Sequence, residues 1–110
     1  MDLIEYILAC NADELPPGKS IVVVHEKSPI AVFNVDGAFF AVSNVCPHAA
    51  GPLEYGFIEH GRIVCPWHGW SFPLSPEDPP NDGLPRYRVA VENGELRIQL
   101  PAIEPGKNWR

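Results

Sequence analysis

The sequence is poor in basic residues and has no long apolar run. Its 110 residues include 8 Lys and Arg against 14 Asp and Glu, which gives a formal net charge of −6 at pH 7. This charge argues against a general nucleic-acid binder, because contact with phosphates requires a basic surface, and it suits a partner that presents a basic patch. No apolar stretch approaches the roughly 20 residues that a membrane span needs, and the first residues lack the basic start and apolar block of a signal peptide. We therefore expect a cytoplasmic protein with neither nucleic acid nor a membrane as partner.

Cysteine is also scarce, and its number is odd. Three cysteines in a chain without a secretion signal do not predict a disulfide framework, and thiols close to histidines instead raise the question of a metal site. The chain also lacks a convincing amphipathic helix pattern, whereas Pro and Gly are abundant, with 13 and 9 residues. Because 45% of the residues are hydrophobic, the composition is not that of a disordered chain. Length and composition together predict a single all-β domain spanning residues 1–110.

Three two-residue turns, Asp36-Gly37, His60-Gly61 and Asn93-Gly94, predict three β-hairpins, because each places apolar residues opposite one another. In this order, the expected cross-strand partners are Val35–Ala38, Phe33–Phe40 and Ala31–Val42; Ile58–Ile63, Phe57–Val64 and Gly56–Cys65; and Val91–Leu96, Val89–Ile98 and Tyr87–Leu100. The first hairpin is apolar on both faces, so we expect it at the centre of the domain. The third has one polar face, on which we expect Arg86. Further strands are expected at residues 4–9 and 21–25, and the proline-rich segment 72–85 is expected to form an ordered loop.

Two short motifs carry the candidate chemistry. Cys46-Pro47-His48 is followed, after sixteen intervening residues, by Cys65-Pro66-Trp67-His68, and the hairpin at His60-Gly61 brings both motifs to the same end. Two Cys and two His could hold one zinc ion, but a single residue between Cys46 and His48 is tight for a chelate to one ion. A two-iron cluster removes this difficulty, because each motif can send its cysteine to one iron and its histidine to the other. The spacing is typical of a Rieske [2Fe–2S] centre.

Residues 46–72 resemble Rieske-type proteins, and the wider run 21–100 is similar to the small soluble Rieske ferredoxins. The resemblance implies stacked antiparallel sheets, with one [2Fe–2S] cluster per chain at the tip of a small cluster-binding subdomain of about residues 44–85. It also implies that Cys46 and Cys65 are ligands of the buried iron, and that His48 and His68 are ligands of the outer iron. Membrane-complex Rieske proteins carry extra cysteines that join the two ligand loops, and their absence here places the chain with the soluble group.

Four other side chains have expected roles. Cys10 is expected to be a buried inert thiol rather than a ligand. Trp67 and Trp70 are expected to shield the cluster or to pack under it, with a role in electron transfer or in docking as the alternative. Trp70 and Phe72 stand where high-potential relatives carry hydroxyl donors, so we expect a reduction potential near the low end of the Rieske range.

The resemblance implies a one-electron carrier that passes electrons from a flavoprotein reductase to a terminal oxygenase. With all four ligands used to saturate two irons, we expect no catalytic site on this chain. One alternative is the small Rieske subunit of an NAD(P)H-dependent nitrite reductase, whose partner is the large subunit. A second alternative is a zinc-stabilised interaction domain.

Overall fold

The computed structural model describes residues 4–67 and 69–103, and within them the chain is built from β-strands and two short 3-10 turns. The elements are β1 (Glu5–Asn11), η1 (Ala12–Glu14), β2 (Ser20–His25), β3 (Ser28–Val35), β4 (Ala38–Ser43), η2 (Leu53–Tyr55), β5 (Phe57–Glu59), β6 (Arg62–Val64), β7 (Ser71–Pro73), β8 (Arg86–Tyr87), β9 (Val89–Glu92) and β10 (Glu95–Leu100). The expected all-β class is confirmed. Across the described part of the chain, no helix is long and apolar enough to cross a membrane.

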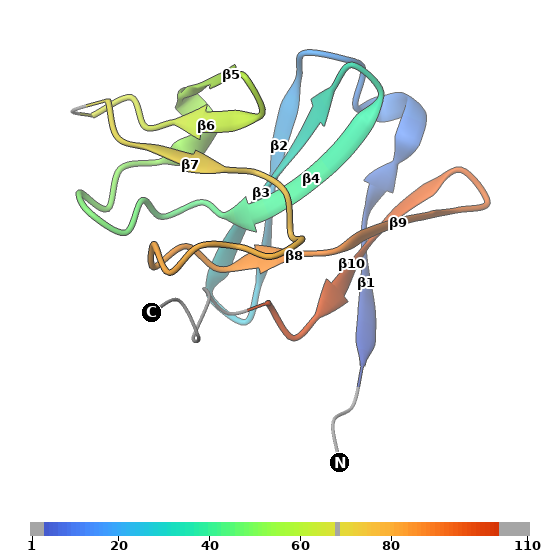
Figure 1. Cartoon of the computed structure of the whole chain (residues 1–110). Helices are drawn as coiled ribbons and strands as arrows, with labels where there is room; N and C mark the ends of the chain where they lie inside the picture. The colour runs from blue at the N-terminus through green and yellow to red at the C-terminus, as the bar shows by residue number, and fades with distance from the viewer. Residues whose placement is uncertain (1–3, 68, 104–110) are drawn as a thin grey trace.

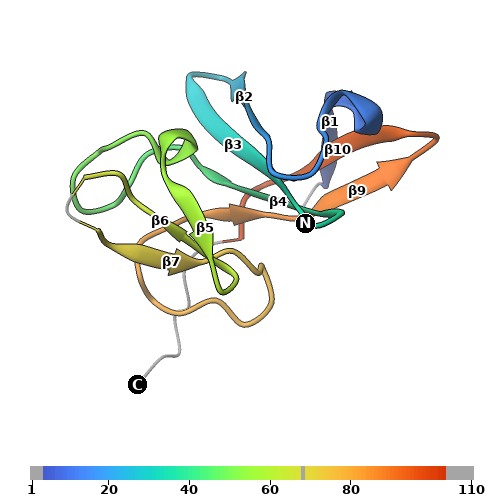
Figure 2. The same ribbon diagram turned by 90° about the horizontal axis from the view of Figure 1, so that it is seen from above.

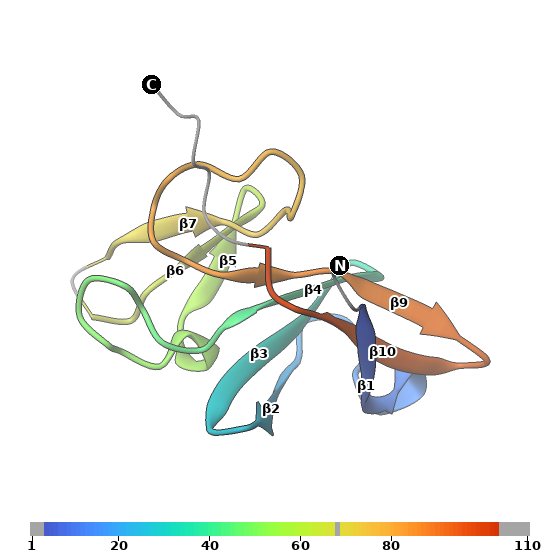
Figure 3. The same ribbon diagram turned by 90° about the horizontal axis from the view of Figure 1, so that it is seen from below.

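The strands form three antiparallel sheets with the orders β1-β10-β9, β2-β3-β4-β8 and β5-β6-β7. The four-stranded sheet lies between the other two (Figures 1 and 2). Seen from below, the β5-β6-β7 sheet and the β1-β10-β9 sheet are at opposite ends of the molecule (Figure 3). The arrangement therefore separates a small sheet, next to the two cysteine motifs, from the rest of the domain.

The register predicted from the three turns is largely confirmed. All three expected pairs of the Asp36-Gly37 hairpin form, as do the first two pairs at each of the other turns. Each turn has positive φ at both residues, for example 52° at Asp36 and 95° at Gly37, as two-residue turns of the primed type require. The strands expected at 4–9 and 21–25 correspond to β1 and β2, and the segment expected as a loop begins with β7.

Two of the predicted pairs do not form. Tyr87 lies opposite Ala41 of β4 instead of Leu100, because the chain changes sheets at Arg88, whose carbonyl accepts a hydrogen bond from the Gln99 N–H. The change of sheet also buries Arg86, which the register had placed on a polar face.

The second missing pair is Gly56 with Cys65. Their N–H groups donate to the carbonyls of Leu53 and Trp70, so the β5–β6 ladder ends at the pair Phe57–Val64. Gly56 still passes very close to β6, because a Cβ built on it would be 1.9 Å from the Val64 carbonyl oxygen.

The buried side chains form two groups, one on each face of β3, which confirms that the central hairpin is covered on both sides. One group contains Ile30, Val32, Ala41, Tyr87 and side chains of β10. The other contains Ala31, Phe33 and Val42 together with Cys46 and Cys65. The second face of the central sheet therefore leads directly to the predicted metal ligands.

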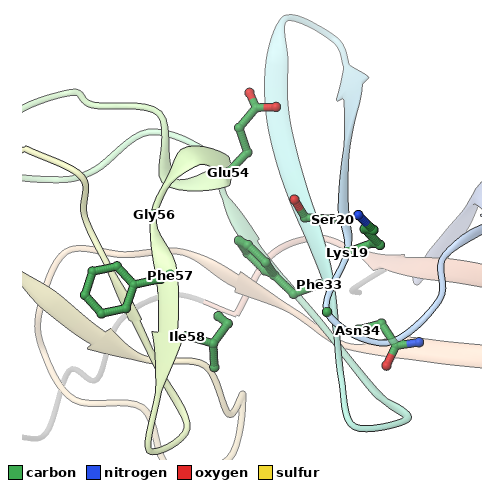
Figure 4. Close-up of a pocket in the computed structure, with 9 residues that line it drawn as sticks. Lys19, Ser20, Phe33, Asn34, Glu54, Gly56, Phe57 and Ile58 are labelled. Atoms are coloured by element: carbon green, nitrogen blue, oxygen red, sulfur yellow. The ribbon is translucent and has the colours of Figure 1, made fainter.

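A cleft separates β5 from β2 and β3. Its volume is about 350 Å³, and its lining includes Phe33, Asn34, Glu54 and Ile58 (Figure 4). The side-chain amide of Asn34 is already engaged, since it donates to the Leu15 carbonyl and accepts from the Gly37 N–H. Of the predicted ligands that the structure describes, Cys46, His48 and Cys65 do not line this cleft, and the two cysteines follow β4 and β6.

Candidate metal centre

Cys46 and Cys65 lie side by side in the core. Cys46 follows the end of β4 and Cys65 directly follows β6, and each is 1% exposed. Burial raises the pKa of the Cys65 thiol above its usual value, the hydrogen-bonding backbone N–H of Trp67 acts in the opposite direction, and a hydrogen bond with Cys46 adds to the increase. The structure therefore brings the two predicted cysteines together, and both are free thiols.

The first ligand loop, residues 45–52, is closed by its own backbone. The Cys46 N–H donates to the Gly51 carbonyl at 2.9 Å, and the Ala50 N–H donates to the Cys46 carbonyl at 2.8 Å. At its base, the Asn44 side chain donates to the carboxylate of Glu54 at 3.0 Å and accepts from the Glu54 N–H at 2.8 Å. The protein's own hydrogen bonds therefore fix the shape of this loop.

The second ligand loop, residues 65–70, is closed in a similar way. The Cys65 N–H donates to the Trp70 carbonyl at 2.7 Å, and the next residue, Ser71, pairs with Val64 in the β6–β7 ladder. The Arg62 side chain reinforces the base of the loop through its Nε, 3.0 Å from the Ser71 hydroxyl. The loop is thus an extension of the β6–β7 hairpin.

Aromatic side chains join the two loops. His48 is exposed, and its ring stacks on that of Trp70 with centroids 3.8 Å apart. Trp67 lies over the first loop, since a Cβ built on Gly51 would be 3.0 Å from the indole ring. Both tryptophans are half exposed, at 50% and 48%, so they cover the loops without being enclosed. Both tryptophans of the second loop therefore contact the first loop.

His68 lies outside the described residues, so the structure gives no position for this predicted ligand. In the part of the chain that the structure does describe, no three Cys, His, Asp or Glu side chains are grouped closely enough to hold one metal ion. Cys10 is far from the motifs in sequence, packs beside the other buried group, and is half buried. Of the predicted ligand set, the structure therefore shows the two cysteines, Cys46 and Cys65, close together.

The segment 74–85 forms a third wall of the site. Leu84 is fully buried in the same group as Cys46 and Cys65, and a Cβ on Gly83 would be 3.2 Å from the Cβ of Pro47. Arg86 holds this segment, and hydrogen bonds between its guanidinium and the Asp82 carboxylate are 2.7 and 3.1 Å long. The sequence did not indicate that Arg86 and Asp82 form a pair at the site, because the alternation in the third hairpin placed Arg86 in solvent.

The donor set fits an iron–sulfur cluster. Two thiols are enclosed by apolar side chains, and a backbone N–H reaches one of the sulfurs, as in the protein environments that hold such clusters. The exposed imidazole of His48 stands on the outer side. Comparison with known families agrees, since the family described as the Rieske [2Fe-2S] domain matches residues 5–86.

The chain belongs to the Rieske [2Fe–2S] domain family. It carries one [2Fe–2S] cluster per chain, as this family does. The 3-phenylpropionate/cinnamic acid dioxygenase ferredoxin subunit of Escherichia coli (strain K12) is 36% identical over 105 residues, which cover 90% of this chain and 97% of that protein. The family match and the relative therefore agree with the resemblance drawn from the motifs.

Two solved structures are similar to this chain over most of their length. A chain from the complex of reduced oxygenase and oxidized ferredoxin in carbazole 1,9a-dioxygenase is 27% identical, with a TM-score of 0.75 over 94% of this chain and 97% of that chain. The putative NADH-dependent nitrite reductase small subunit from Mycobacterium tuberculosis is 26% identical, with a TM-score of 0.78 over 93% of this chain and 100% of that chain. Both functional alternatives thus have a structural counterpart of similar length.

Proposed function

We propose that this protein is a one-electron carrier that takes electrons from a flavoprotein reductase and delivers them to a terminal oxygenase. The proposed ligands are Cys46 and Cys65 for the buried iron and His48 and His68 for the outer iron. The observation that carries the proposal is the pair of buried thiols behind an exposed imidazole. The ferredoxin subunit from E. coli supports the oxygenase system as the setting, because it is matched over nearly its whole length.

The arrangement gives each half of the site a different task. The cysteines lie in the apolar core, where Phe72 and Leu84 exclude water. His48 lies at the exposed side, so a partner that contacts this end comes closest to the cluster through the imidazole. When bound, the cluster supplies a one-electron redox couple, and its four protein ligands leave no open coordination position for a substrate. The chain therefore acts in oxidoreduction without a catalytic site of its own.

The first experiment tests the ligand set. Purified protein should hold two irons and two sulfides, and alanine at Cys46, His48, Cys65 or His68 should remove them. Cys10→Ala is the matched control and should retain both, because Cys10 packs in the other buried group. Full iron content in the Cys65→Ala protein would contradict the assignment. Zinc in place of iron would restore the interaction-domain alternative.

The second experiment distinguishes the two redox settings. The small subunit of nitrite reductase is the second candidate, favoured by the full-length structural match to the protein from M. tuberculosis. Affinity purification of the tagged protein from its host should recover oxygenase subunits and a flavoprotein reductase. Recovery of a large sirohaem protein would instead favour nitrite reductase. Rapid reduction by the recovered reductase, followed by stopped-flow absorbance, would then establish the donor.

A further inference from the structure

Arg86, at the start of β8, is a fully buried charged side chain with 0% exposure. Its Nε donates to the Pro73 carbonyl at 2.8 Å, and its Nη1 donates to the Leu84 carbonyl at 2.8 Å. Nη1 and Nη2 also donate to the two carboxylate oxygens of Asp82, at 3.1 and 2.7 Å. The guanidinium is thus bound on several sides by hydrogen bonds of ordinary length.

These bonds connect the two ligand loops through the segment 74–85. Pro73 is the last residue of β7, which continues the second ligand loop. Asp82 and Leu84 flank Gly83, which packs against Pro47, and Pro47 stands between the proposed ligands Cys46 and His48. The Asp82 carboxylate is fixed further by the Leu84 N–H, at 3.1 Å. Arg86 therefore contacts the strand after the second loop directly. It reaches the first loop indirectly, through the segment around Gly83 that packs against Pro47.

The chemistry of the pair favours a geometric role over a contribution to overall stability. A buried ion pair gains little net stability, because taking both charges out of water offsets most of their attraction, but it fixes its partners in one arrangement. The planar guanidinium makes bonds in several fixed directions, which the single ammonium group of lysine cannot reproduce. Two residues later, Arg88 pairs with Glu77 of the same segment at an exposed position. This exposed ion pair can be compared with the buried pair of Arg86 and Asp82.

We propose that Arg86 is a positioning residue for the cluster. Together with Asp82, it holds residues 82–84 against Pro47, and this contact limits the access of water to the first ligand loop. The reduction potential and the retention of the cluster therefore depend on a side chain that is not a ligand. This inference rests on the proposed function, because it takes Cys46 and His48 as ligands.

The test compares Arg86→Lys with Arg88→Lys, both as cluster-loaded protein. Both variants keep the positive charge. Only Arg86→Lys loses the buried guanidinium that donates to both carboxylate oxygens of Asp82. In Arg86→Lys, amide hydrogen exchange in residues 45–52 should accelerate about tenfold, while exchange in β3 changes by less than about threefold. The midpoint potential should rise, because added water stabilises the more negative reduced cluster, and the cluster should be lost faster to a chelator. Arg88→Lys should match wild type in all three measurements.

Two results would overturn the proposal. One is an Arg86→Lys protein with loop exchange and potential equal to those of Arg88→Lys. The other is equal acceleration in β3 and in residues 45–52, which would show that Arg86 only stabilises the domain. If Arg86→Lys does not fold, Asp82→Asn tests the proposal by the same hydrogen-exchange comparison. This variant weakens the hydrogen bonds to Arg86 without changing the size of the side chain at position 82. Failure of the ligand assignment shows separately, as iron retained in Cys65→Ala.

Discussion

The imidazole of His48 stacks on the indole of Trp70, with ring centroids 3.8 Å apart and planes inclined by 18°. The two residues come from different ligand loops, so the stack joins the loops at their exposed side. Phe72 continues the stack, with its centroid 6.0 Å from that of His48. The two positions that lack hydroxyl donors, Trp70 and Phe72, therefore both face the first ligand loop.

The first prediction concerns the reduction potential. Rieske potentials span roughly −150 to +300 mV, and donors to the sulfurs raise them because they stabilise the reduced cluster. Phe72 is 2% exposed and lies in the buried group that contains Cys46 and Cys65. We expect wild-type protein near the low end of the range, and a higher midpoint in Phe72→Tyr, whose hydroxyl enters this group. Protein-film voltammetry measures both values.

The control is Phe57→Tyr, which adds the same hydroxyl to a side chain that is 57% exposed on β5. Its midpoint should equal that of wild type. A wild-type midpoint well above zero would contradict the reasoning from the missing donors, as would equal midpoints in the two tyrosine variants.

The second prediction concerns the approach of Gly56 to β6. A Cβ at this position would be 1.9 Å from the Val64 carbonyl oxygen, which is backbone and cannot rotate away. Gly56→Ala should therefore lower the free energy of unfolding by about 3 kcal/mol, the upper part of the usual range for overpacking. Gly61→Asn is the control, since φ is +75° and no heavy atom lies within 4 Å of a built Cβ. Chemical denaturation should show a large loss for the first variant alone.

The register of the hairpins could be predicted from sequence because it depends on local turn chemistry and on alternation. At Asp36-Gly37 both signals agree over three pairs, and every pair forms. The proximity of Cys46 and Cys65 followed from the same reasoning, because a hairpin returns the chain to the end from which it started. Local rules thus located the thiols.

The positions of Arg86 and Tyr87 could not be predicted in this way. Alternation alone continues the third hairpin through Tyr87, whereas tertiary packing moves this residue to the central sheet, opposite Ala41. The buried guanidinium of Arg86 donates to a partner that is distant in sequence, the carbonyl of Pro73, thirteen residues away. Contacts of this kind depend on how sheets pack, which periodicity does not encode. The same limit applies to the contact between Gly83 and Pro47.

The third prediction concerns Cys10. Burial raises the pKa of this thiol above its usual value, and the nearby carboxylates of Glu14 and Asp13 raise it further. Because the thiolate is the reactive form, alkylation of Cys10 should be slow at pH 8 and should increase only in more alkaline solution. Iodoacetamide labelling as a function of pH, read by mass spectrometry, should give a midpoint above that of a cysteine peptide. Glu14→Gln should lower it, and a wild-type midpoint below the peptide value would be inconsistent with this account.

The last prediction follows from the distribution of charge. Residues 44–53 and 65–74, which contain both ligand loops, have no Asp, Glu, Lys or Arg, although the chain as a whole has a net charge of −6. Val45, Trp67 and Trp70 are 42%, 50% and 48% exposed in these segments. The exposed surface of these two segments is therefore uncharged and largely apolar, and the acidic residues that would attract a basic partner lie outside them.

The association rate and the dissociation rate should accordingly depend on different features of the protein surface. The net charge acts at a distance and is screened by salt, so the association rate with the recovered oxygenase should fall as ionic strength rises. Dissociation should hardly respond to salt, because the apolar contact carries no charge. Trp67→Ala should increase the dissociation rate about tenfold, the effect of losing roughly 1.4 kcal/mol of binding. Tyr6→Ala is the control, because Tyr6 has a similar exposure of 48% but lies on β1, in the sheet at the opposite end of the molecule. Surface plasmon resonance at several salt concentrations separates the two rates, and visible absorbance verifies that each variant retains its cluster. If dissociation accelerates with salt while Trp67→Ala behaves like Tyr6→Ala, charged contacts hold the complex and the apolar surface does not.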